Sequence, residues 1–212
     1  MKKIKYSEIT PEKIFYNRRS FIKSISIGAG SIAMSSLPFT SNAMTKDRDN
    51  KTSYKNITTY NNYYEFGTSK SDPYKNSQNF KTSPWNISIE GEVEKPVSLS
   101  MEEISEMYVS EERVYRLRCV EGWSMVIPWM GFSLSELLSK VVPTSKAKFV
   151  EFESVYDPDQ MKGQRYPVLK WPYKEGLRID EAMHPLSTVV TGLYNKKLPN
   201  QNGAPLRIFV PW

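Results

Sequence analysis

The sequence predicts an α+β fold in which strands and short helices are mixed. Strand-like and helix-like segments follow one another without the regular strand–helix rhythm that builds a parallel sheet. The composition, 39% hydrophobic and 25% charged residues, is that of a globular chain with enough apolar material for a core. The sequence contains neither GxGxxG nor GxxxxGK(S/T), so the phosphate loops of doubly wound folds are not expected.

Alternating apolar and polar residues predict the strands. The candidate segments are Trp85–Val93 (interrupted by Gly91), Val114–Val120, Phe149–Tyr156, Thr188–Tyr194 and Leu206–Val210. In the second segment Tyr115, Leu117 and Cys119 share one face, and Ser154 lies on a face of the third.

Capping boxes predict two helix starts. Ser100 with Glu103 opens one short helix, and Ser133 with Glu136 opens another. After Ser133, apolar residues recur at the helical period, at Leu134, Leu137, Leu138 and Val141.

Residues 1–43 are predicted to be a twin-arginine signal peptide. Arg18-Arg19 is followed by Phe21, an uncharged stretch at 24–43 and the small-x-small site Ser41-Asn42-Ala43. The stretch is too rich in Ser and Gly for a membrane span of about 20 apolar residues. We therefore expect export to the periplasm by the twin-arginine translocase.

The basic charge of the chain belongs to this leader. The formal net charge is +6, and residues 1–43 hold seven basic against two acidic residues. The remainder is nearly balanced, with 22 basic and 21 acidic residues. A nearly neutral body lacks the electrostatic footprint of a nucleic-acid-binding domain.

Three regions are predicted along the chain: the leader, a polar linker at 44–59 and a catalytic domain at 60–212. The domain begins with four aromatic residues in the segment Tyr60–Gly67, which we call the aromatic arm. The sequence ends on an apolar strand pattern, Arg207–Trp212. We therefore expect the domain to be incomplete at its C-terminus.

Cys119 is the one cysteine and His184 the one histidine, so neither an internal disulfide nor a four-ligand zinc site is expected. Any metal must bring most of its ligands. Cys119 follows Arg118, and a neighbouring cation favours the thiolate that ligates metals. From these residues alone, a lone cysteine at a strand end is more often a buried structural residue than a ligand.

Four segments carry a family resemblance: Arg118–Trp129 (RCVEGWSMVIPW), Tyr60–Gly67, Glu175–Leu186 and Gln201–Trp212. The chain resembles the sulfite-oxidase-like molybdopterin family, and within it the catalytic subunits of bacterial protein-methionine-sulfoxide reductases. The resemblance implies a sulfite-oxidase-like molybdopterin-binding fold and a molybdenum-molybdopterin cofactor with one molybdopterin.

The resemblance also implies the site residues. Cys119 would be the molybdenum ligand, and Arg207 would reach the pterin phosphate. The other cofactor contacts would be Asn61, Tyr64, Glu65, Ser154 and Asn202, with Ser154 standing where relatives carry Thr. Without the resemblance, Asn202-Gly203 is also typical of a turn, and Trp123 and Trp129 are typical of a core.

The implied function is reduction of methionine sulfoxide in oxidised periplasmic proteins, by oxygen-atom transfer to the molybdenum centre. Electrons would come from a haem-containing membrane partner fed by quinone. Two alternatives stay open: a sulfite dehydrogenase on the same fold, and a cofactor-free secreted binding module. Residues 120–125 include Glu121 and no basic residue, which favours a neutral sulfoxide over the sulfite dianion.

Replacing both Arg18 and Arg19 by lysine is expected to leave uncleaved precursor in the cytoplasm, because the translocase reads the arginine pair. Fractionation followed by immunoblotting measures this. An unchanged yield of processed protein in the periplasm would contradict the twin-arginine prediction.

Overall fold

The computed structural model describes residues 50–211, which belong to one compact unit, Thr45–Trp212. The leader predicted at 1–43 lies outside the described residues. Among residues 50–211, no helix has the length and apolar character needed to cross a bilayer.

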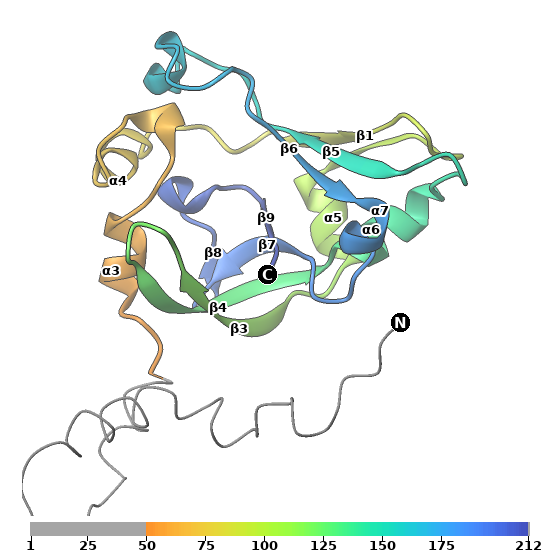
Figure 1. Cartoon of the computed structure of the whole chain (residues 1–212), viewed down its shortest axis with the longest axis horizontal. Helices are drawn as coiled ribbons and strands as arrows, with labels where there is room; N and C mark the ends of the chain where they lie inside the picture. Colours follow the sequence, from red (N-terminus) through yellow and green to blue (C-terminus); the bar gives the residue numbers. More distant parts are fainter. Residues whose placement is uncertain (1–49, 212) are drawn as a thin grey trace, which may run out of the picture. The chain divides into compact units, whose positions relative to one another are not determined.

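Three antiparallel sheets make up the domain (Figure 1). The central sheet contains β3 (Glu111–Arg118), β4 (Ser124–Ser133), β7 (Thr188–Leu193), β8 (Lys196–Lys197) and β9 (Arg207–Phe209). Its order is β3-β4-β7-β8, and β9 pairs with the first half of β7. Two hairpins, β1 (Asn86–Ile89) with β2 (Val97–Ser100) and β5 (Phe149–Glu153) with β6 (Lys174–Arg178), form the other sheets.

Short helices and 3-10 turns connect the strands. They are α3 (Tyr54–Thr59), η3 (Tyr64–Phe66), α4 (Asp72–Asn76), α5 (Met101–Met107), α6 (Leu134–Val141), η4 (Lys162–Arg165), α7 (Ile179–Ala182) and η5 (Asn200–Asn202). The α+β prediction is confirmed, and each predicted strand is present with bounds that differ by a few residues.

The middle of the central sheet, at β7 and most of β4, is buried on both faces. Neighbouring residues of a strand point to opposite faces, so Val189 packs in one core with Phe132 and Leu137, whereas Val190 packs in another with Ile127 and Trp129. The first core lies under α5, α6 and the two outer hairpins. The second core includes α3 and lies beside the residues predicted to form the site.

The capping box at Ser100 is confirmed. Ser100 Oγ accepts from the Glu103 backbone N–H at 3.2 Å, and Glu103 Oε2 accepts from the Ser100 N–H at 2.8 Å. These two bonds satisfy backbone donors that the first turn of α5 leaves unpaired.

The capping box predicted at Ser133 is wrong, although the helix α6 that follows is present with its apolar face buried. Ser133 Oγ bonds the Ser135 hydroxyl at 2.8 Å and caps no backbone N–H. The Leu134 N–H donates to the Ser187 carbonyl at 2.8 Å. This bond follows the Ser133–Thr188 pair of β4 with β7 and does not substitute for the cap.

Part of the predicted polar linker forms helix α3. The Ser53 hydroxyl caps it by accepting from the Asn56 N–H at 3.3 Å, and Ile57 is 1% exposed in the second core. Because one apolar residue in a polar segment gives no helical period, the sequence did not reveal this helix.

The predicted strand Val114–Val120 ends earlier than expected, at Arg118. Residues 119–123, which we call the thiol loop, join β3 to β4. The Gly122 N–H donates to the Cys119 carbonyl at 3.0 Å, and Gly122 adopts a φ of +81°. Cys119 therefore lies in a turn and not on the face of β3.

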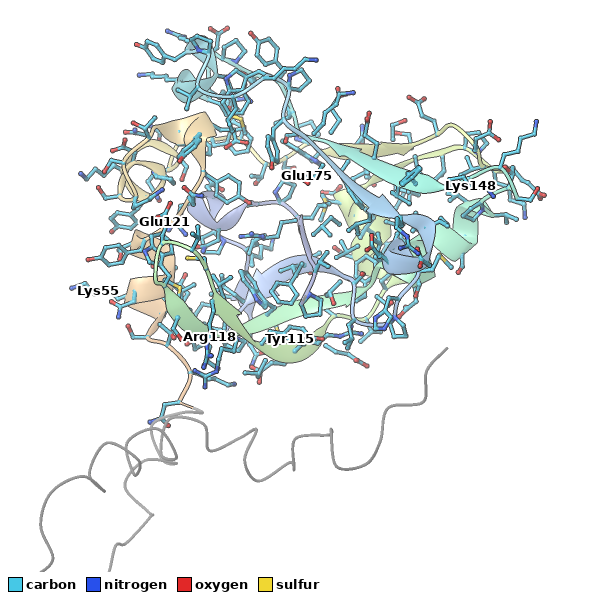
Figure 2. All side chains as sticks on the ribbon, viewed as in Figure 1. Lys55, Tyr115, Arg118, Glu121, Lys148 and Glu175 are labelled. Carbon is cyan, nitrogen blue, oxygen red and sulfur yellow. The ribbon has the colours of Figure 1, made fainter. Side chains whose placement is uncertain are left out.

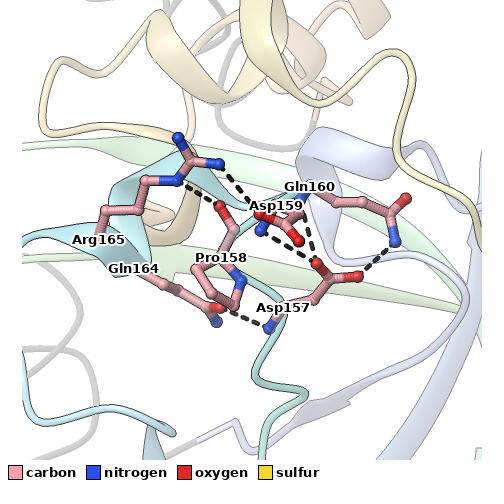
Figure 3. A network of polar contacts seen from close by, with 6 residues as sticks. All are labelled: Asp157, Pro158, Asp159, Gln160, Gln164 and Arg165. Atoms are coloured by element: carbon pink, nitrogen blue, oxygen red, sulfur yellow. Dashed lines mark hydrogen bonds and ion pairs between the residues drawn. The ribbon is translucent and has the colours of Figure 1, made fainter.

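The segment after β5 is held by polar contacts around Asp157 (Figure 3). Asp157 Oδ1 accepts from the N–H groups of Asp159 and Gln160, and Gln164 accepts from the Asp157 N–H at 2.7 Å. These contacts place η4 against η3, where an added Cβ on Gly163 would lie 1.9 Å from the Tyr64 carbonyl oxygen. The aromatic arm therefore packs directly on η4.

Gly163→Ala is expected to destabilise the domain by about 1 to 3 kcal/mol, because the new methyl group must displace backbone. Gly176→Ala is the matched control, since its Cβ would lie 3.9 Å from the nearest atom. Urea unfolding of both variants measures the difference in the free energy of unfolding. Equal stabilities would contradict the close packing of η3 on η4.

Candidate cofactor site

A cavity of about 290 Å³ lies between α3 with the aromatic arm, the thiol loop, strand β4, and η5 with β9. Its lining residues are Ile57, Tyr60, Asn61, Asn62, Tyr63, Leu117, Cys119, Val120, Glu121, Trp123, Met125, Ile127, Trp129, Asn202, Arg207 and Phe209. Segments that are far apart in the sequence therefore meet at one hollow.

The structure brings four of the residues that sequence analysis selected to this cavity: Asn61, Cys119, Asn202 and Arg207. Tyr64 and Glu65 follow in η3, directly after the lining residue Tyr63. Ser154 is not among the lining residues. It lies just beyond β5, where its hydroxyl donates to the Tyr173 carbonyl at 3.2 Å.

Asn61 and Asn202 present unpaired acceptors. The Nδ2 group of each donates to the Ile57 carbonyl oxygen, in both cases at 3.1 Å. This shared acceptor fixes how the two amides are turned. Both Oδ1 atoms are then buried without a hydrogen-bond partner, which is costly unless a ligand supplies a donor.

Arg207 and Trp129 present unpaired donors. Arg207 Nη1 donates to the Asn202 carbonyl at 3.1 Å, and the guanidinium lies 5.2 Å from the Trp129 ring centre and 5.6 Å from that of Tyr63. Arg207 Nε and Trp129 Nε1 are both buried without a partner. In the described part of the chain, no carboxylate forms an ion pair with Arg207.

Trp129 is a candidate that sequence analysis left undecided between core and site. The structure gives it both roles, since it is 4% exposed in the second core and lines the cavity. Only the three-dimensional contacts reveal that its indole N–H lacks a partner. The sequence signal is limited to its place in the strand that follows Cys119.

Asn202-Gly203 likewise combines two roles. Gly203 ends η5 with a φ of +98°, as a turn residue would. An added Cβ there would lie 2.2 Å from the Tyr63 hydroxyl. The turn therefore lets the aromatic arm approach closely while Asn202 lines the cavity.

Cys119 is exposed on the thiol loop. Beside it, Glu121 forms an ion pair with Lys70 at 2.8 Å; Figure 2 labels Glu121, and Arg118 at the end of β3. This hydrogen bond to Glu121 is the main reason that the pKa of Lys70 is raised. The acid next to the thiol is therefore neutralised by a cation from another segment.

Glu65 is a buried acid, 8% exposed, in η3. Burial raises the pKa of its carboxyl, and a backbone hydrogen bond opposes this in part. Tyr173 lies close enough for the charge of Glu65 to contribute to raising the Tyr173 pKa to about 12, although the hydrogen bond to Glu175 is the larger cause. Glu65 therefore interacts electrostatically with Tyr173, the residue whose carbonyl accepts from Ser154. None of these three residues lines the cavity.

Comparisons with known proteins show the family to which the chain belongs. The family model described as "Oxidoreductase molybdopterin binding domain" matches residues 74–212. The catalytic subunit MsrP of the protein-methionine-sulfoxide reductase of Xanthomonas axonopodis pv. citri (strain 306) is 49% identical over 97% of this chain and 68% of its own length. The same subunit of Burkholderia mallei (strain ATCC 23344) is 47% identical over 97% of this chain and 67% of its own length.

The chain belongs to the family of protein-methionine-sulfoxide reductase catalytic subunits. The resemblance proposed from the sequence is therefore confirmed. Among solved structures, the sulfane dehydrogenase SoxCD from Paracoccus pantotrophus superimposes with a TM-score of 0.51 at 14% identity. The match covers 68% of this chain and 36% of that one, and it confirms the sulfite-oxidase-like fold.

The cavity fits a molybdopterin in its donor set. Its unpaired acceptors, the two Asn Oδ1 atoms, suit the N–H groups of a pterin, and its unpaired donors, on Arg207 and Trp129, suit oxygen acceptors such as phosphate. Among the described residues, no group of three or more His, Cys, Asp or Glu side chains is placed to hold a metal. A metal in this cavity would therefore need most of its ligands from the cofactor.

Trp129→Phe is expected to weaken cofactor binding by about 1 kcal/mol, roughly five-fold, because the N–H donor is lost. The cofactor-free protein should also lose stability, because phenyl is smaller than indole and leaves space in the second core. Molybdenum and pterin content per chain, with urea unfolding alongside, measures both effects. Trp85→Phe is the control, because Trp85 packs on Phe80 and does not line the cavity. Unchanged cofactor content in Trp129→Phe would contradict the assignment.

Proposed function

We propose that this chain is the catalytic subunit of a periplasmic reductase that acts on methionine sulfoxide residues of oxidised proteins. The observation that carries the proposal is the cavity beside the chain's one cysteine, with four buried polar atoms that lack partners. The relatives that share this chain's sequence are named as protein-methionine-sulfoxide reductase catalytic subunits.

In this proposal each wall of the cavity has a task. Cys119 ligates molybdenum as the thiolate, beside a single molybdopterin. Asn61 and Asn202 accept from the pterin, while Arg207 and Trp129 donate to its phosphate end. When bound, the molybdenum centre supplies two-electron oxygen-atom transfer.

The remaining lining favours a thioether side chain. Leu117, Val120, Trp123 and Met125 lie around the thiol and are apolar or aromatic. They would pack against the methylene groups of methionine sulfoxide and limit the water around the reacting sulfur.

The charges around the cavity favour sulfoxide over sulfite for a different reason from the one that the sequence suggested. Glu121 is paired with Lys70, so it is not a free carboxylate that repels a dianion. The stronger point is that sulfite needs several converging cations, and among the described residues Arg207 alone of the basic side chains lines the cavity. Arg165 and Arg178 pair with Asp159 and Asp180 away from it.

Export and electron supply belong to the same proposal. The arginine pair at 18–19 and the uncharged stretch to Ala43 support transport by the twin-arginine translocase. A haem-containing membrane subunit fed by quinone would deliver the two electrons that each turnover consumes. Oxidised periplasmic proteins would be the substrates.

Cys119→Ser is expected to abolish sulfoxide reduction and to change the spectroscopic signature of the molybdenum centre, because a hydroxyl is a harder and weaker ligand than a thiolate. Electron paramagnetic resonance and single-turnover assays measure both. Full activity in the Cys119→Ser enzyme would rule out this residue as the ligand.

The enzyme supplied with reduced viologen is expected to reduce free and protein-bound methionine sulfoxide and to show little sulfite oxidation with an artificial acceptor. Saturable sulfite oxidation without sulfoxide turnover would favour the sulfite dehydrogenase alternative. A purified protein that contains neither molybdenum nor pterin would favour the cofactor-free binding module.

A further inference from the structure

The Lys70 side chain bonds lining residues from two different segments of the cavity. Lys70 Nζ lies 2.8 Å from Glu121 Oε1 on the thiol loop and 2.7 Å from Asn62 Oδ1 on the aromatic arm. The same ammonium group lies 5.3 Å from the centre of the Tyr64 ring. Lys70 is therefore bonded at once to the loop that carries Cys119 and to the arm.

The Lys70 backbone fixes the side chain's starting point. Its carbonyl oxygen accepts from the backbone N–H of Asn61 at 3.0 Å, a residue that lines the cavity and whose Oδ1 is buried without a partner. Movement of Lys70 is therefore coupled to the position of Asn61 as well as to the thiol loop.

The thiol loop needs such a contact. It connects the end of β3, which in the described part of the chain pairs only with β4, to the start of β4. Val120 is fully exposed and Cys119 is exposed, so little apolar burial holds this turn. Loops with few buried contacts open at low free-energy cost.

We propose that Lys70 is a positioning residue for the reaction: it holds the thiol loop through Glu121, so that Cys119 stays at the cavity that Asn61 and Asn202 also line. The inference rests on the proposed function in that Cys119 is taken as the molybdenum ligand. Both partners are partly exposed, 30% for Lys70 and 38% for Glu121, so the effect concerns local order rather than global stability.

Amide hydrogen exchange of the purified protein tests the restraint directly. In Lys70→Met, peptides that cover residues 117–125 should exchange roughly two- to five-fold faster, as expected for loss of a partly exposed ion pair. Lys70→Arg should restore slow exchange. Lys70→Met combined with Glu121→Gln should be no faster than either single variant, because both remove the same contact.

Lys51→Met is the matched control. Lys51 forms an ion pair of similar length and exposure, 2.7 Å to Glu112 on β3, and does not line the cavity. Exchange of residues 117–125 should stay at the wild-type rate in this variant. Unchanged exchange in Lys70→Met, or an equal increase in Lys51→Met, would overturn the proposal.

A second readout asks whether the restraint reaches the metal. In the cofactor-loaded enzyme, Lys70→Met should broaden or shift the molybdenum paramagnetic resonance signal, whereas Lys51→Met should not. Faster exchange with an unaltered signal would overturn the positioning role. Because exchange is measured without turnover, failure of the proposed function, seen as full activity in Cys119→Ser, remains distinguishable from failure of this inference.

Discussion

The carbonyl group of Ile57 is the point on which the geometry of the cavity depends. Its oxygen accepts from the side-chain amides of both Asn61 and Asn202, which come from opposite ends of the domain's sequence. The Ile57 side chain is meanwhile 1% exposed in the second core. Hydrophobic burial therefore holds α3 in place, and its Ile57 carbonyl orients the side-chain amides of Asn61 and Asn202. Among the described residues, the Oδ1 atoms of these amides have no hydrogen-bond partner, so their burial costs free energy.

The domain keeps these polar atoms unpaired at a cost. A buried acceptor or donor without a partner costs about 1 to 3 kcal/mol, and four such atoms lie in one cavity. Packing elsewhere has to offset this, and the two-sided burial of β7 through Val189 and Val190 is the clearest source. A bound cofactor that paired with these atoms would therefore add to the stability of the domain.

The features that sequence analysis predicted correctly are those set by neighbours in the chain or by family motifs. The capping box at Ser100 is local, and its partner lies three residues away. The resemblance placed Asn61, Cys119, Asn202 and Arg207 together although they are far apart in sequence. The errors arise where contacts that the pattern does not specify, near or distant, decided the outcome.

At Ser133 the hydroxyl contacts Ser135 and caps no backbone N–H, and in the predicted linker the second core selected a helix around Ile57. The roles of Lys70 and Trp129 depend on contacts with other segments, so no local pattern marks them. Ser154 shows the converse case. It matches a cofactor-contact position of the family in sequence, but it does not line the cavity.

The Cys119 thiol lies on an edge hairpin, so it can move separately from the rest of the site. The wall formed by Asn61, Asn202, Arg207 and Trp129 is built from α3, the arm, η5, β4 and β9, whereas the sulfur lies on a turn at the end of the outermost strand. Fraying of the last β3–β4 pairs would move the sulfur without unfolding that wall. Under the proposed function, Cys119 would thus lie on the part of the site that opens at the lowest free-energy cost, while the wall residues stay folded.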